Sequence, residues 1–245
     1  NCEVVIAADE YYRKCVSEPA GSQASWNARD QHMTTTLLRI QAHLSDPKII
    51  VWAHNSHVGD STATTRGGDS FEKNETWNLG QMVRATFGHH KTWIVGQYTY
   101  GGTVTAAQRW GGEHEDRKLN PALPDSYEGA LHREVQPHMG NAIGFYFATA
   151  PFADPEGKEE SKEGAVGGTF SAARACVRAA LKANEPVARA LTEILQPSVS
   201  RLQRWVGVSY KADTERQSHY GALVLSQCYD QIVYVHSTRG LLPIV

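Results

Sequence analysis

Residues 48–60 decide the fold, and they read KIIVWAHNSHVGD. Residues 49–53 are an apolar run rich in β-branched and aromatic side chains, which is typical of a strand buried on both faces in a parallel sheet. His54 and His57 follow directly, with polar residues between and after them. Ligands of open α/β sheets bind outside the carboxyl ends of the strands. We therefore expect the chemistry of this chain at the end of this strand.

Helical and strand-like stretches alternate on both sides of it. Two amphipathic helices are predicted before it, over residues 4–16 and about 25–44. A third helix, over residues 78–87, follows the strand and ends at Gly88, and a second strand is predicted at 92–99. A strand, a helix and a strand with short links form a right-handed parallel crossover.

The remaining elements are shorter. The second helix is expected to bury Met33, Leu37, Ile40 and Leu44, and Gly101-Gly102 to end the second strand. Further predictions are a short helix capped by Asp125 or Ser126, strands at 142–148, 205–210 and 231–236, and helices at 172–182 and 187–195.

These patterns predict an α/β fold with a mostly parallel central sheet flanked by helices. No internal repeat divides the chain, so we expect one domain over residues 1–245. Residues 154–168 are charged and glycine-rich, and we interpret them as a surface loop within that domain and not as a linker.

The composition is that of an ordinary soluble globular protein, with 41% hydrophobic residues, 20% charged residues and a net charge of -2. No basic stretch favours nucleic acid as a partner, and no apolar run approaches the ~20 residues of a membrane span. The four cysteines form no C-x-x-C pair, which favours reduced thiols and a cytoplasmic or organellar location over secretion. The chain starts at Asn1 without a methionine, so we expect a processed protein or part of a longer one.

The two histidines have the chemistry that ester hydrolysis needs. Imidazole serves as base or acid near neutral pH. If the loop turns helically, His54 and His57 project to the same side, with Cβ atoms ~5–6 Å apart. Asn55 is a candidate to hold a ring tautomer or to donate to an oxyanion, and Asp60 to orient a ring.

Two other interpretations of the histidine pair remain. One is a metal site, although catalytic zinc usually takes a third protein ligand and the familiar helical pair is spaced by four residues. The other is a structural role, with both rings bonded to backbone. The sequence has no G-x-S-x-G motif, which counts against a serine hydrolase. Glu128 lies early in a predicted helix, where its charge suits the helix dipole without any catalytic duty.

A set of stretches, taken in order, resembles the signatures of the erythromycin esterase family. They are residues 25–33, 52–60, 78–81, 99–107, 110–112, 126–128, Tyr210 and 214–220. The resemblance implies a central sheet and a large helical part with a cleft between them, lined by His54 and His57. It also implies hydrolysis of a carboxylic ester or macrolide lactone by an activated water, with no cofactor, no required metal and no acyl-enzyme. Asn55, Asp60 and Glu128 are the supporting candidates.

One signature of the family has no counterpart here. Its N-terminal half carries a Gly-Glu-x-x-His-type motif whose histidine is taken as the water-activating base, so these residues resemble the C-terminal portion alone. Cleavage of the small-molecule ester or lactone would then require the N-terminal half of the family fold, which a separate chain or a larger assembly would supply. The alternative is a degenerate member that serves as a structural or small-molecule-binding subunit.

Overall fold

The computed structural model describes residues 2–19, 22–45, 47–66, 69–70, 76–149 and 184–241. The surface loop predicted at 154–168 and the helix predicted at 172–182 lie outside these ranges. Of the cysteines, Cys2 and Cys15 are exposed and Cys228 is buried, and all three are free. No described helix is both long and apolar enough to cross a membrane.

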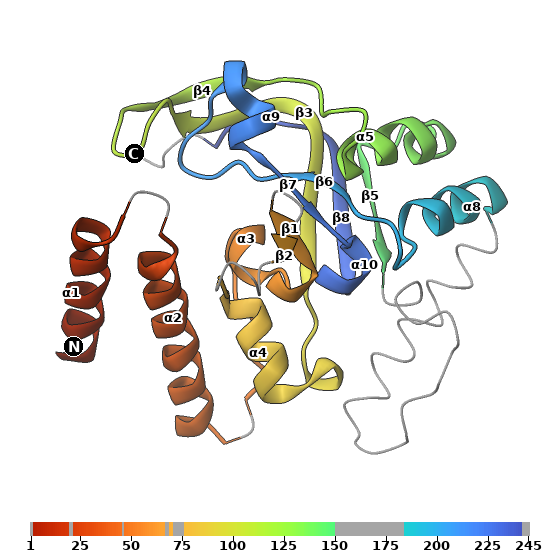
Figure 1. Cartoon of the computed structure of the whole chain (residues 1–245). Helices are drawn as coiled ribbons and strands as arrows, with labels where there is room; N and C mark the ends of the chain where they lie inside the picture. The colour runs from red at the N-terminus through yellow and green to blue at the C-terminus, as the bar shows by residue number, and fades with distance from the viewer. Residues whose placement is uncertain are drawn as a thin grey trace.

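Within the described ranges the strands form two four-stranded sheets (Figure 1). The larger sheet has the order β4 (His114–Leu119), β3 (Val95–Ala107), β8 (Gln231–Thr238) and β5 (Gly144–Ala148). The smaller sheet has the order β2 (Asp69–Ser70), β1 (Thr64–Arg66), β7 (Tyr220–Leu223) and β6 (Arg201–Arg204). The predicted α/β class with a sheet flanked by helices is confirmed. The described strand pairs are antiparallel except β3 with β8, however, so the sheets are not mostly parallel.

Helices lie on both sides of the strands (Figure 1). They are α1 (Cys2–Ser17), α2 (Ala24–His43), α3 (Asn55–Val58), α4 (Leu79–Phe87), α5 (Tyr127–Ala130), α8 (Glu185–Ile194), α9 (Glu215–Ser218) and α10 (Leu225–Cys228). Helices α1 and α2 pack side by side, and α4 lies between α2 and the strands. On the opposite side, α8 packs on the π-helical turn Leu131–Val135 that continues α5.

Several predicted elements are confirmed. The helices expected at 4–16, 78–87 and 187–195 are α1, α4 and α8, and Gly88 ends α4 with a φ of 78°. Ser126 caps α5 by accepting a hydrogen bond from the Gly129 N–H. The strands at 142–148 and 231–236 are β5 and β8.

Two predicted strand boundaries are wrong. The strand expected at 205–210 lies earlier in the chain, as β6 at Arg201–Arg204. The second boundary concerns β3, which does not end at Gly101-Gly102. Up to Gly102 the residues of β3 pair with β8, and from Gly102 onward they pair with β4. Gly102 has a φ of 111°, and a Cβ there would overlap the Thr238 backbone. The glycine therefore lets one strand change partners in place of ending it.

The strand expected at 48–53 is also wrong. These residues form neither a helix nor a strand, and their backbone makes no hydrogen bond with any other described residue. Ile50 is 93% exposed and Trp52 is 86% exposed. A strand is buried on both faces only where other elements cover those faces, and the described residues leave this segment uncovered.

Helix α2 buries a polar face where an apolar one was expected. Ile40 and Leu44 are exposed, whereas Asn27, Asp30 and Thr34 are buried. The reason is local, because the Asn27 and Asp30 side chains accept backbone hydrogen bonds at the start of α4, from Trp77 and Leu79. A buried polar group is stable when it is bonded in this way.

Candidate active site

The segment that carries the two histidines is fixed to β3 by Asn55. The Asn55 Nδ2 donates to the Gln97 carbonyl over 2.7 Å, and the Gln97 N–H donates to Asn55 Oδ1 over 3.1 Å. Both ends of the amide are thus used on the strand backbone. Asn55 contacts neither imidazole through these bonds, so it anchors the segment and does not set a ring tautomer.

Helix α4 holds the same segment from the other side. The Asn78 Nδ2 donates to the carbonyls of Ser56 (2.9 Å) and Gly59 (2.6 Å), while its Oδ1 caps α4. Gly80 lies so close to the Val58 carbonyl that a Cβ would overlap it. These contacts bring α3 and its histidine against α2.

His57 forms a hydrogen-bonded pair with Asp30. The His57 Nδ1 lies 2.9 and 3.0 Å from the two carboxylate oxygens of Asp30, whose side chain is fully buried. An ionised carboxylate only accepts hydrogen bonds, so Nδ1 carries the proton, and in the neutral ring Nε2 then has the lone pair. The Leu79 N–H donates to the same carboxylate over 3.2 Å. Asp30 is therefore held in place and fixes both the orientation and the tautomer of the ring.

Two further residues of α2 surround the His57 ring. The Trp26 ring stacks on it with centroids 4.5 Å apart and planes 5° apart. The Arg29 guanidinium lies 4.9 Å from the Trp26 ring centroid, and its terminal nitrogen lies 3.2 Å from His57 Nε2. Since Nε2 has the lone pair, Arg29 is the donor. The His57 side chain remains 16% exposed.

His54 has the opposite tautomer. Its Nε2 lies 3.1 Å from the Val206 carbonyl and must donate to it, while its Nδ1 accepts from the Ser56 N–H and hydroxyl. The residue is exposed, yet the protein atoms around the ring lower its pKa through desolvation, against the Val206 hydrogen bond, which raises it. The two histidines thus share one short segment but bond to different elements, His57 to α2 and His54 to the chain after β6.

The expectation that Asp60 orients a ring is not met by its contacts. Asp60 is buried, accepts from the Thr62 N–H over 3.1 Å and pairs with Arg84 over 3.2 Å. The aspartate that orients a histidine is Asp30. It was missed because it lies 27 positions before His57 on a different helix, and no spacing rule links the two residues.

Glu128 lies in the core beside β6 and is joined to neither histidine by a described hydrogen bond. Its Oε1 accepts from the Arg204 N–H over 2.9 Å, and Oε2 is buried with no partner among the described residues. Burial raises the pKa of the carboxyl to about 7, partly offset by hydrogen bonds and Arg204. These contacts give Glu128 a structural role, joining α5 to β6.

The Glu128 carboxyl makes stability pH-dependent. Its folded pKa of about 7 lies above its ordinary value of 4.5, so the protonated form stabilises the fold. That contribution is fully present below pH 4.5 and is lost as the pH rises to 7, by about 3 kcal/mol in total. In Glu128→Gln we expect this decline in unfolding free energy to disappear between pH 5 and 8, in urea titrations. An unchanged decline in the variant would assign the slope to other groups.

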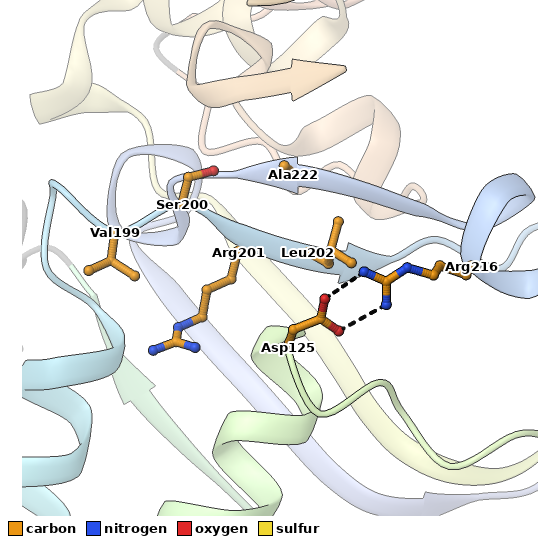
Figure 2. Close-up of a pocket in the computed structure, with 7 residues that line it drawn as sticks. All are labelled: Asp125, Val199, Ser200, Arg201, Leu202, Arg216 and Ala222. Carbon is orange, nitrogen blue, oxygen red and sulfur yellow. Dashed lines mark hydrogen bonds and ion pairs between the residues drawn. The ribbon is translucent and has the colours of Figure 1, made fainter. Parts of the chain in front are cut away.

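The structure also has an open pocket that none of the candidate residues lines (Figure 2). It is lined by Asp125, Val199, Ser200, Arg201, Leu202, Arg216 and Ala222. Arg216 donates two hydrogen bonds to Asp125, of 3.2 and 2.7 Å (Figure 2). No group of three or more histidine, cysteine or acidic side chains in the described ranges is arranged to hold a metal ion.

The fold and this site define an α/β protein with a half-buried histidine–aspartate pair beside its larger sheet. The sequence pattern of the erythromycin esterase family matches residues 1–238. The chain therefore belongs to the erythromycin esterase family, as the resemblance predicted.

Three solved structures are similar to this chain, and the two with TM-scores above 0.5 support the architecture. A protein from Bacillus cereus has a TM-score of 0.56 at 15% identity, and the match covers 93% of this chain and 42% of the Bacillus cereus protein. A succinoglycan biosynthesis protein has a TM-score of 0.54 at 14% identity, and the match covers 96% of this chain and 48% of that protein. A mutant of the erythromycin esterase EreC in its open conformation has a TM-score of 0.47 at 15% identity, and the match covers 99% of this chain and 44% of the mutant. The chain thus spans less than half the length of each.

Proposed function

We propose that this chain is part of a hydrolase that cleaves a carboxylic ester or lactone with an activated water, without a metal. The observation that carries the proposal is the Asp30–His57 pair, which leaves a lone pair on Nε2 at a partly exposed ring. A base oriented by a carboxylate is the usual arrangement for removing a proton from a nucleophile. Membership of the erythromycin esterase family makes ester cleavage the expected reaction class.

In this proposal His57 moves the proton, in place of the N-terminal histidine to which the family resemblance assigns that role. Its Nε2 takes a proton from water as the water oxygen attacks the carbonyl carbon, and the imidazolium is stabilised by Asp30. The proton then passes to the leaving alkoxide oxygen as the C–O bond breaks. His54 lies three positions before His57 on the same segment, and its N–H is a candidate donor to the developing oxyanion if it leaves the Val206 carbonyl.

The site would be completed by the remaining part of the family fold. The similar solved structures are about twice as long as this chain, and the segment that leads into His54 carries exposed Ile50 and Trp52, with a backbone that is unpaired among the described residues. An unpaired apolar strand is a ready site for another strand to add. We propose that the other half of the fold pairs there, in the same polypeptide or as a separate chain.

Hydrolysis and simple binding are separated by isotope labelling. The longest polypeptide that the gene encodes is incubated in ¹⁸O-water with a panel of carboxylic esters and macrolide lactones. We expect a product acid carrying one ¹⁸O atom, with no change in the intact mass of the protein, because water attacks directly. Ligand binding without any product acid would contradict the proposal and favour a non-catalytic binding subunit. A stable acyl adduct would contradict the direct attack.

A further inference from the structure

We propose that Arg29 is an anion-binding residue that caps the Nε2 of His57 and leaves it for a carboxylate or oxyanion of the ligand. The inference deepens the proposed function and rests on it for the identity of the ligand, since ester hydrolysis passes through an oxyanion and ends in a carboxylate. Its physical basis is the set of contacts that Arg29 makes on α2.

Among the described residues, the guanidinium lies over the Trp26 ring and forms no hydrogen bond to a carboxylate. It lies 4.9 Å from the Trp26 ring centroid, and Trp26 is itself fixed by a 3.0 Å hydrogen bond from its Nε1 to the Trp77 carbonyl. The nearest carboxylate oxygen among the described residues is Asp30 Oδ1, which lies 3.9 Å from Arg29 Nε, within ion-pair distance but too far for a hydrogen bond. Stacking on an aromatic face leaves the edge of the guanidinium open for planar anions.

Most of the donors of Arg29 are unused within the described part of the chain. A guanidinium has five N–H donors, and one is used, towards His57 Nε2 over 3.2 Å. The Nε is buried without a hydrogen-bond partner, while the side chain as a whole is 34% exposed. A cation that is oriented, accessible and poorly satisfied is suited to bind an anion from solvent.

The bond to His57 is also the weaker of the two that Arg29 can make. The charge of Arg29 assists both bonds, but a neutral imidazole accepts only one hydrogen bond, whereas a carboxylate adds its own negative charge and accepts two parallel bonds from an arginine. A bound carboxylate therefore draws Arg29 from Nε2 and exposes the lone pair. In the proposed reaction, the anion that Arg29 takes up is the oxyanion that develops as water attacks, or the carboxylate product.

Chemical modification tests this without any turnover. Diethyl pyrocarbonate acylates imidazole nitrogens that have a free lone pair, and peptide mass spectrometry measures the rate separately at His57 and at His54. In the longest native polypeptide we expect slow modification of His57, and several-fold faster modification in Arg29→Ala. We expect 50 mM acetate, at constant ionic strength, to accelerate His57 several-fold in the native protein and not in Arg29→Ala.

The controls decide between anion binding and other effects. Acetamide matches acetate in size without its charge and should leave the His57 rate unchanged. His54 serves as the internal reference, because Arg29 makes no bond to it. Equal His57 rates in the native protein and in Arg29→Ala, or equal acceleration by acetate in both, would overturn the proposal. If Arg29→Ala is unfolded by circular dichroism, Arg29→Gln replaces it.

The outcomes also separate this inference from the proposed function. Acceleration by acetate in a protein that hydrolyses no ester would keep the anion site and remove the hydrolase. Ester hydrolysis without any effect of acetate or of the Arg29 substitution on His57 modification would keep the hydrolase and remove the anion site.

Discussion

An Asp30→Asn substitution is expected to lower the rate of ester hydrolysis by about 10³- to 10⁴-fold while the chain stays folded. The asparagine keeps an oxygen that can accept from the Leu79 N–H, but its amide also offers N–H donors to the ring. His57 then turns or takes the Nε2–H tautomer, which has no lone pair for the substrate water. Initial rates under saturating substrate, measured with the longest native polypeptide, give this effect.

Asp60→Asn is the matched control for that result. Asp60 is also buried but binds Arg84 and not a histidine, so the rate per folded molecule should stay within about threefold of the native value. The double variant of Asp30→Asn with His57→Gln should be little worse than either single variant, because the two residues act as one unit. Multiplied effects in the double variant would show that Asp30 and His57 act independently.

Arg84→Ala is expected to lower the free energy of unfolding by about 3–5 kcal/mol. The Arg84 side chain is 4% exposed and joins Asp60 over 3.2 Å to Asp230 over 2.7 Å, with a further bond to the Gln227 carbonyl. Without the arginine, two buried carboxylates face each other with no cation between them. This network ties α4 to the start of β8 and thereby supports the helix that holds α3.

Arg216→Ala provides the comparison with an exposed ion pair. Arg216 and Asp125 are each more than half exposed, and surface pairs contribute about 0–1 kcal/mol. Urea titrations followed by circular dichroism at pH 7 measure both variants. Similar losses in the two variants would mean that the Asp60–Arg84–Asp230 network does not stabilise the fold through its buried charges.

The sequence predicted elements whose residues satisfy one another locally. Helix α4 has its own cap in Asn78 and its own stop in Gly88, and β5 and β8 are short apolar runs bounded by turns. Such features depend on neighbouring residues, and periodicity detects them. The resemblance in ordered motifs identified the family for the same reason, since it needs no tertiary contact.

The predictions that failed depend on what lies opposite an element. Residues 48–53 have the composition of a buried strand, but in the described structure Ile50 and Trp52 have no cover. Helix α2 has an apolar stripe, but its polar face packs on α4. Periodicity shows that a face is apolar and cannot show which face meets a neighbour.

The candidate site was predicted in part. The position of His54 and His57 after an apolar run located the segment, whereas their partners could not be predicted from spacing. Asp30, Trp26 and Arg29 reach His57 from a helix about 30 positions earlier in the chain. These residues lie within the stretch 25–33 that carries part of the family resemblance, and that stretch was the one signal that pointed to them.

The tautomer of His57 tests the central claim most directly. Two-bond ¹H–¹⁵N correlation spectra of the longest native polypeptide, recorded at pH 8, distinguish a protonated Nδ1 from a protonated Nε2, with His57→Gln and His54→Gln assigning the signals. The Asp30 pair predicts a proton on Nδ1 of His57, and the Val206 bond predicts one on Nε2 of His54. A proton on Nε2 of His57 would show that Asp30 does not hold this ring and that the proposed base is absent.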